Sequence, residues 1–209
     1  MKAGIAKHWV LCEGLDDSRV MEALAVHMGI ADKLHFEHYA ESGFHAYLKT
    51  LRSRPELTSG AIGSILVTKD ADSDFSKAWQ SVSDAVSKAF DIALPEPGSW
   101  VQAPDGPRLA GWVMPGPGKT GMIETLCLDA ARETGEDIFS CLDSFVECVN
   151  ATRDSKLHEK ARFHIWTVIA QSPGAQDRLS LQRALNQMPP NWDAVAFEGL
   201  RKVLNKTIA

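Results

Sequence analysis

The sequence predicts an α/β protein with a mostly parallel central sheet flanked by helices and with an all-helical C-terminal portion. Strand-like and helix-like segments alternate three times between His8 and Phe90, which is the pattern of a doubly wound parallel sheet. From Glu136 onward, only helical patterns follow. We therefore expect an α/β domain over residues 1–135 and a helical portion over residues 136–209 that packs on it.

Four runs of strand length predict the strands of the sheet. The runs are His8–Cys12, Leu34–Tyr39, Ile62–Lys69 and Leu109–Met114. The first run is apolar and ends at Glu13, and the second alternates apolar and polar residues. The third run has the strongest strand pattern in the chain. A segment rich in Pro and Gly, residues 95–107, precedes the fourth run and predicts a loop or a hairpin.

Helices are predicted between and after these strands, because apolar residues recur at helical spacing and the ends carry stop and start signals. The first helix begins at Asp16–Ser18, which supply N-cap candidates, and stops at Gly29. Asp74 is the expected cap of the third helix, and Pro55 ends the second. The other expected helices are Gly43–Arg54, Phe75–Phe90, Met122–Arg132, Asp137–Ala151, Ser155–Gln171, Leu179–Asn186 and Asp193–Asn205.

Composition excludes several classes of protein. Hydrophobic residues make up 44% of the chain and charged residues 23%, which are ordinary values for a globular protein. The formal net charge of −5 means that any contact with nucleic acid must use a local basic patch. Four cysteines without a C-x-x-C pair argue against a zinc site and a disulfide scaffold. With no signal peptide and no apolar run of about 20 residues, we expect a cytoplasmic protein without a membrane partner.

Carboxylates recur where the predicted strands end. Glu13 follows the first strand, Asp70 and Asp72 follow the third, and Glu124 opens the helix after the fourth. Ligands of open α/β sheets bind outside the carboxyl ends of the strands. Alternate residues of an extended segment point the same way, so Asp70 and Asp72 are expected to face one point. Several carboxylates there would repel one another without a cation, and Mg²⁺ is suited to such hard oxygen ligands.

Four segments of the chain resemble a known family. Residues 10–17, VLCEGLDD, resemble the first Toprim motif, and residues 65–72, ILVTKDAD, resemble the second. The sequence is most similar to a bacterial family of stand-alone Toprim proteins related to the overcoming-lysogenization-defect nucleases. In that family a Gly-Trp-x-Met-Pro strand leads to a Gly-Met-x-Glu helix start, and residues 111–115 and 121–124 match this order. The resemblance extends from about Trp9 to Leu204.

The resemblance implies a Toprim, Rossmann-like fold and a Mg²⁺-dependent nuclease, with Mn²⁺ as a possible substitute and DNA or RNA as the partner. It assigns Glu13 as general base or metal ligand, and Asp70 and Asp72 as metal ligands. Asp16 or Asp17 would assist, Glu124 would serve a second metal, and Lys160 would stabilise developing phosphate charge. Thr68-Lys69 ahead of Asp70 departs from the family, which usually has an apolar residue there, and Lys69 could neutralise the site or point to solvent.

Two other functions stay open at this point. The fold could be catalytically idle and bind a partner protein or a nucleotide, with its carboxylates held apart or in salt bridges with Lys69 or Lys119. It could also be a phosphotransferase or phosphatase acting on a small molecule, which the absence of a basic groove would favour. The sequence leaves the oligomeric state open, so a homo-oligomer is as compatible with it as a monomer.

Overall fold

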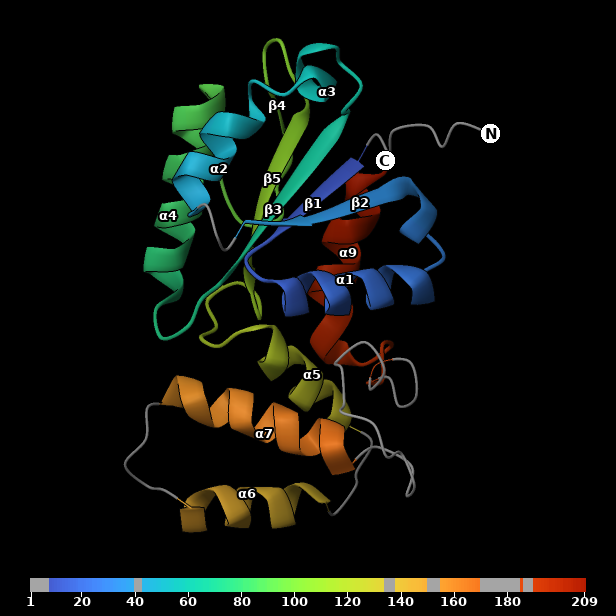
Figure 1. Cartoon of the computed structure of the whole chain (residues 1–209), viewed down its shortest axis with the longest axis vertical. Coiled ribbons are helices and arrows are strands. Elements are labelled where there is room, and N and C mark those ends of the chain that lie inside the picture. The colour runs from blue at the N-terminus through green and yellow to red at the C-terminus, as the bar shows by residue number, and fades with distance from the viewer. Residues whose placement is uncertain (1–7, 40–42, 134–137, 150–154, 170–184, 186–189) are drawn as a thin grey trace.

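The computed structural model describes residues 8–39, 43–133, 138–149, 155–169, 185 and 190–209. Its centre is a five-stranded sheet with the strand order β2-β1-β3-β5-β4 (Figure 1). The strands are β1 (His8–Cys12), β2 (Leu34–His38), β3 (Ser64–Asp70), β4 (Val101–Gln102) and β5 (Arg108–Met114). Neighbouring strands are parallel except for β4, which pairs antiparallel with β5. The predicted α/β class with a mostly parallel sheet is therefore confirmed.

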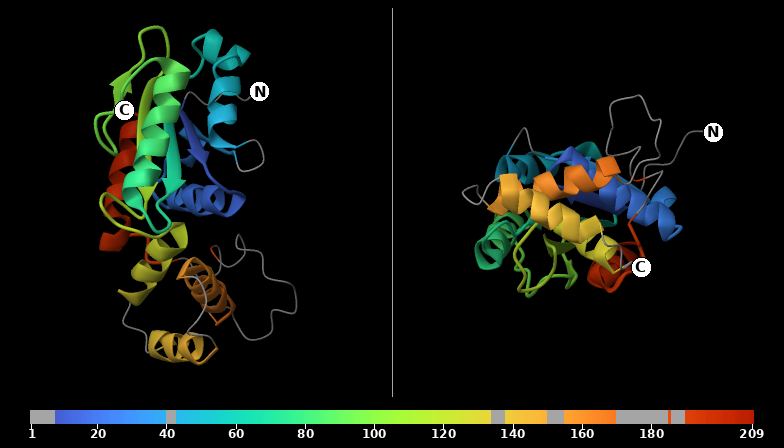
Figure 2. Two further views of the ribbon diagram at one scale, coloured as in Figure 1. Left: turned by 90° about the vertical axis from the view of Figure 1, so that its left-hand side faces the viewer. Right: turned by 90° about the horizontal axis from the view of Figure 1, so that it is seen from below.

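Helices lie on both faces of the sheet and beyond its carboxyl edge (Figures 1 and 2). They are α1 (Leu15–His27), η1 (Ala31–Lys33), α2 (Phe44–Leu51), α3 (Pro55–Thr58), α4 (Phe75–Phe90), α5 (Ile123–Arg132), α6 (Ile138–Val149), α7 (Ser155–Ile169), η2 (Val195–Phe197) and α9 (Glu198–Thr207). The expected helix at Gly43–Arg54 ends at Leu51, and Pro55 starts the separate helix α3 because proline is favoured in a first turn. The expected helix at Leu179–Asn186 lies outside the described residues except for Leu185.

The side chains of each strand point alternately to the two faces of the sheet, and this divides the core into two layers. In β1, Val10 and Cys12 join α1, α5 and α9 on one face of the sheet, whereas Trp9 and Leu11 join α2, α3 and α4 on the other. Successive side chains of a strand point to opposite faces, and β1 is buried on both. This double burial explains why β1 reads as a continuous apolar run in the sequence.

The last helix returns to the sheet. Leu200, Val203 and Leu204 of α9 are buried in the same layer as α1 and α5. The Ser64 hydroxyl of β3 donates to the carbonyl of Thr207 at 2.6 Å. Helices α6 and α7 instead lie beyond the carboxyl edge of the sheet, below α5 in Figure 1. Within the described part of this portion, α9 thus packs in the sheet layer, whereas α6 and α7 lie beside α5. No helix of the described residues is long and apolar enough to cross a membrane.

Candidate metal centre

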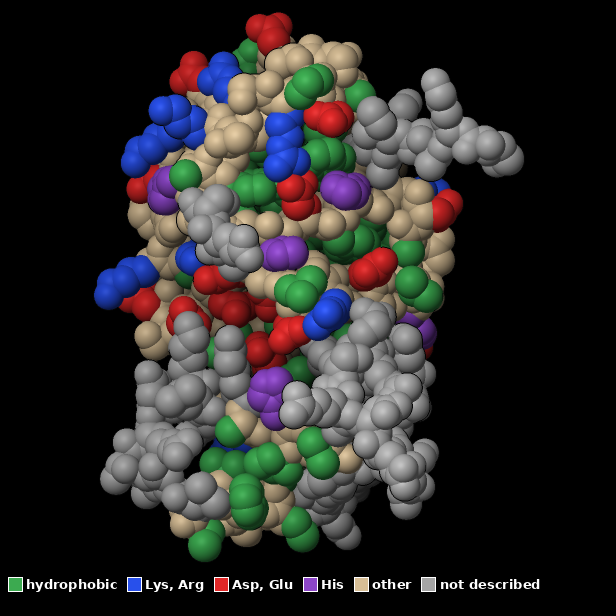
Figure 3. Space-filling view, viewed as in Figure 1, with side chains coloured by type: hydrophobic (Ala, Val, Ile, Leu, Met, Phe, Trp, Pro, Cys, Tyr) green, Lys and Arg blue, Asp and Glu red, His purple; other side chains and the backbone are tan. Residues whose placement is uncertain are grey.

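The carboxyl edge of the sheet contains a topological switch point between β1 and β3. These strands are adjacent and parallel, but α1, which follows β1, covers one face, and α4, which follows β3, covers the other. Chains that leave adjacent strands toward opposite faces open a crevice at the strand ends, where ligands of open α/β sheets bind. Acidic side chains gather near this edge, above the helices α5 to α7 (Figure 3).

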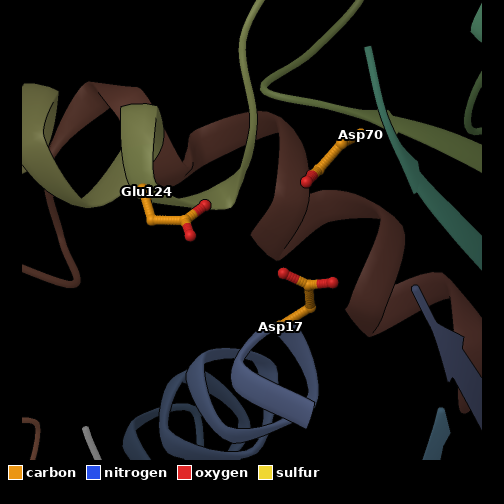
Figure 4. A group of neighbouring side chains, drawn as sticks. All are labelled: Asp17, Asp70 and Glu124. Atoms are coloured by element: carbon orange, nitrogen blue, oxygen red, sulfur yellow. The ribbon is translucent and has the colours of Figure 1, made fainter. Parts of the chain in front are cut away.

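Three carboxylates converge in the crevice. Asp17 lies in the first turn of α1, Asp70 is the last residue of β3, and Glu124 lies in the first turn of α5. Each contributes an oxygen atom, and these three atoms lie within 4.8 Å of one another. Figure 4 shows the side chains pointing toward one another from the three elements. Segments separated by more than fifty residues along the chain thus form one acidic cluster.

Local hydrogen bonds hold two of these elements in place. Asp17 also caps its helix, because its Oδ2 accepts the backbone N–H of Gly14 at 2.7 Å. The backbones of Asp72 and Gly121 exchange two hydrogen bonds of 2.8 and 2.7 Å, which tie the segment after β3 to the segment before α5. At the start of α5, the N–H of Met122 donates to Oγ1 of Thr125 at 3.1 Å. Glu124 therefore enters the crevice from a tethered helix start.

Burial and neighbouring negative charge raise the pKa of Asp70 well above its usual range. Burial is the main cause, and it is followed by the charges of Asp17, Glu124, Glu13 and Asp72. Both causes favour the neutral acid, since burial penalises the charged form and like charges repel it. A cation bound among these groups would remove that repulsion.

The same negative field reaches groups around the crevice. Burial raises the pKa of the Tyr39 hydroxyl, and Glu13 adds to the effect. Burial likewise raises the pKa of the Cys127 thiol, with further contributions from Glu124 and Asp17. Tyr39 is held beside the site, because its hydroxyl donates to the carbonyl of Thr68 at 2.8 Å. Both raised pKa values favour the neutral thiol and the neutral phenol.

Glu13 lies next to the cluster and is engaged by its neighbours. Its Oε2 accepts from Nζ of Lys69 at 3.2 Å and from the backbone N–H of Asp70 at 3.3 Å. Lys69 therefore neutralises part of the site, which is one of the two alternatives that the sequence left open. The pair bridges the ends of β1 and β3, so Glu13 orients the strand end that carries Asp70.

Asp72 does not follow the extended geometry expected of it. Its φ is +51°, so the chain leaves the strand conformation after Asp70, and the alternation argument does not apply. Asp72 still adds its charge to the field at Asp70. The sequence ranked Glu13 and Asp72 with Asp70, whereas the structure groups Asp70 with Asp17 and Glu124. The signal for Asp17 and Glu124 was their place in the first turns of helices that follow strands.

Lys160 falls within α7, and its side chain lies outside the described residues. Arg162, two residues later in the same helix, is described and is half-buried. Arg162 pairs with Glu159 at 3.2 Å and with Asp143 at 3.5 Å. Its charge is therefore neutralised by carboxylates of α6 and α7.

The cluster fits a divalent cation by the chemistry of its donors. Three carboxylates supply only oxygen ligands, which suit Mg²⁺, Mn²⁺ and Ca²⁺ better than softer metals. Three protein ligands also leave coordination positions for water or for substrate oxygens, which Mg²⁺ commonly retains. Asp17, Asp70 and Glu124 are the residues that would hold the ion.

The fold and the crevice define a doubly wound α/β protein with a carboxylate cluster at its switch point. The chain belongs to the family described as protein of unknown function, DUF3226, whose model matches residues 7–207. The match spans both the sheet and the helical C-terminal portion. No curated protein and no solved structure matches the chain significantly.

Proposed function

We propose that this protein is a Mg²⁺-dependent, nuclease-like enzyme that cleaves phosphodiester bonds of nucleic acid. The observation that carries the proposal is the convergence of the Asp17, Asp70 and Glu124 oxygens within 4.8 Å of one another. The resemblance of residues 10–17 and 65–72 to the Toprim motifs supports the same reading. A bound divalent ion would polarise a phosphoryl oxygen and lower the pKa of a bound water.

Different residues have different roles in the proposed reaction. Asp17, Asp70 and Glu124 hold the cation, and Asp72 adds negative charge beside it. Glu13, fixed by Lys69 and the Asp70 N–H, is the candidate to accept a proton at its carboxylate. Lys160 on α7 remains the candidate to offset charge on the phosphate, as the resemblance implies.

Metal binding is tested by the thermal stability of the protein with and without Mg²⁺ or Mn²⁺. A ligand that binds only the native state at one hundred times its Kd adds about 2.7 kcal/mol of stability. We expect this stabilisation in the wild type and its loss in Asp70→Asn and Glu124→Gln. Asp16→Asn is the matched control, because Asp16 is an exposed carboxylate one residue before Asp17 and pairs with Arg19.

Catalysis is tested by cleavage of labelled DNA and RNA in the presence of either metal. The wild type and Asp16→Asn should cleave, whereas Asp70→Asn and Glu124→Gln should lose activity by at least a hundredfold. Equal activity of Asp70→Asn and the wild type would refute the proposal.

One observation favours a second candidate, a catalytically idle fold that binds a metal, a nucleotide or a partner protein. Glu13, the residue assigned as general base, forms an ion pair of 3.2 Å with Lys69. For this candidate, Mg²⁺ stabilises the wild type in the thermal assay but no phosphodiester is cleaved. Cleavage by the wild type thus separates the two candidates, and Lys69→Met tests the role assigned to Glu13, since removal of the ion pair should change the cleavage rate of an enzyme that uses Glu13.

A further inference from the structure

A basic groove lies between α2 and α4, on the face of the sheet opposite α1 and α9. Its volume is about 400 Å³, and its lining residues are His45, Lys49, Arg52, Ala85, Lys88 and Ala89. The alanines are buried and form the floor, while the histidine and the three cations are exposed. No described carboxylate lines the groove. In Figure 3, Lys and Arg side chains gather over these two helices.

The charges of this groove are not paired with carboxylates in the part of the chain that the structure describes. Lys49, Arg52 and Lys88 take part in no ion pair among the described residues. The nearest acidic side chain along α4, Asp84, accepts from Gln80 at 2.7 Å, and Asp91 lines an adjacent cavity that Arg52 also lines.

A second surface groove, between α1 and α9, provides a contrast. It has a similar volume of about 420 Å³ and also contains cations. There, however, Lys202 pairs with Glu198, and Arg201 lies 3.9 Å from Asp193. In a protein with a net charge of −5, the groove of α2 and α4 is therefore a concentrated positive site whose cations form no ion pair among the described residues.

Basic residues follow the axis of α2. His45, Lys49 and Arg52 are spaced i, i+4, i+7, which places them on one face of the helix over about 10 Å. Lys88 faces them from α4. The positive charges of Lys49, Arg52 and Lys88 match a ligand whose negative charge repeats along its length.

The groove lacks the apolar anchors that a protein or membrane partner would use. Protein interfaces rely on buried aromatic or large apolar anchors, and interfacial helices insert an apolar face. Among the described residues, the exposed large hydrophobic side chains are Leu15, Val26, Phe145, Val168 and Val195. They belong to α1, α6, α7 and η2, and none lies on α2 or α4. A phosphate backbone needs only cations, so it fits this surface better.

We propose that the groove between α2 and α4 binds the phosphate backbone of a nucleic acid. Its link to catalysis rests on the proposed function and names the substrate as a polynucleotide rather than a small phosphoester. Helix α4 begins at Phe75, shortly after Asp70, and reaches the groove ten residues later at Ala85, which is about 15 Å along a helix. At 3.4 Å per base pair, this length of helix alone corresponds to about four base pairs, so a ligand that reaches both the groove and the acidic cluster must be longer than a single nucleotide.

Binding is measured by fluorescence anisotropy with labelled single-stranded and duplex oligonucleotides in EDTA, so that no divalent metal contributes. The test variant is Lys49→Glu with Lys88→Glu. Arg52 is left in place because its Nη1 donates to the carbonyl of Ala89 at 2.8 Å. The matched control is Lys33→Glu with Lys206→Glu, which makes the same charge change at two exposed lysines outside the groove.

We expect the groove variant to lose at least tenfold in affinity while the control stays within twofold of the wild type. Each lost phosphate contact lowers the slope of log K against log salt by about 0.9 for a duplex, so the slope should fall by about 2. Equal affinity and equal salt slope for the two double variants would overturn the proposal. So would binding of the wild type to vesicles of phosphatidylcholine and phosphatidylserine, but not to oligonucleotides, when Lys49 and Lys88 are required for it.

The proposals for the groove and for the acidic cluster can be refuted independently of each other. The groove is tested by binding in EDTA, and the acidic cluster is tested by metal-dependent stability and cleavage. Loss of binding in the groove variant, together with an Asp70→Asn protein that behaves as the wild type toward metal, would retain the groove and reject the enzyme.

Discussion

Asp70 occupies an environment that is unfavourable for its own negative charge. It ends a buried strand, and burial together with four neighbouring carboxylates raises its pKa. A folded protein without a cation therefore holds Asp70 in an unfavourable environment at neutral pH. Residues placed this way are typical of functional sites, where an arrangement suits a ligand better than it suits the fold.

Asp70→Asn should raise the Tm of the metal-free protein, because the amide has nearly the same shape and carries no charge. Each 1 kcal/mol of repulsion that is relieved should add about 2–4 °C in a protein of this size. Thermal unfolding in EDTA measures the change. The control, Asp16→Asn, loses only an exposed ion pair and should change the stability by less than about 1 kcal/mol.

The increase in Tm that we expect for Asp70→Asn should depend on pH in a defined direction. Because the pKa of Asp70 is raised in the folded state, the native protein binds more protons than the unfolded chain, and its stability falls as pH rises through that pKa. Below the ordinary range of Asp, near pH 4, the acid is neutral in both states and the effect vanishes. The Tm difference between variant and wild type should thus be larger at pH 8 than at pH 5, and an opposite trend would contradict this account.

At the scale of elements, close approach of α4 to the sheet depends on Gly111 in β5. A Cβ at this position would lie 2.7 Å from Cγ1 of Val82 and 2.8 Å from Cζ3 of Trp79, both on α4. A side chain there would push the helix away from the strand. Since α4 follows Asp70 and also forms one wall of the basic groove, this contact supports both proposed sites.

Gly111→Ala should destabilise the protein by about 1–3 kcal/mol, which is the usual effect of overpacking a core. Urea unfolding measures it. Gly106→Ala is a suitable comparison, because Gly106 is exposed and its added methyl would meet only Cβ of Ala103, at 3.3 Å. A loss no greater for Gly111→Ala than for Gly106→Ala would mean that α4 shifts without cost.

Across the whole molecule, the first and the last described elements, β1 and α9, pack together at the same sheet. Ser64 of β3 links its neighbour strand to the C-terminus, because its hydroxyl lies 2.8 Å from Nδ1 of His8 and 2.6 Å from the carbonyl of Thr207. Arg108 of β5 also donates to the carbonyl of Lys206 at 3.2 Å. The last helix of the expected C-terminal portion, α9, therefore packs in the sheet layer of the expected α/β domain.

Leu204→Ala should destabilise the sheet and α9 together by about 2–5 kcal/mol, since Leu204 is fully buried against the sheet layer. Urea unfolding followed by far-UV circular dichroism and by tryptophan fluorescence should give one coincident transition. Asn205→Ala, an exposed neighbour on the same helix, should stay within about 0.5 kcal/mol of the wild type. An early separate transition for α9 would show that the α/β domain folds without it.

The sequence by itself determined the α/β class, the limits of β1 and α4, and the cap of α4 by Asp74, whose Oδ1 accepts from the N–H of Lys77. These features follow from local periodicity and end signals, which depend on residues near one another in the chain. It also placed the carboxylates at strand ends.

Only the tertiary structure decided which carboxylates meet. Asp17, Asp70 and Glu124 come together because strand order, helix placement and the Asp72–Gly121 backbone pair set distances that no local pattern encodes. The groove is a similar case, since α2 shows its row of cations in sequence but Lys88 joins it only when α4 packs alongside. Secondary structure is set by short-range preferences, whereas a site is set by the long-range packing that brings distant segments into contact.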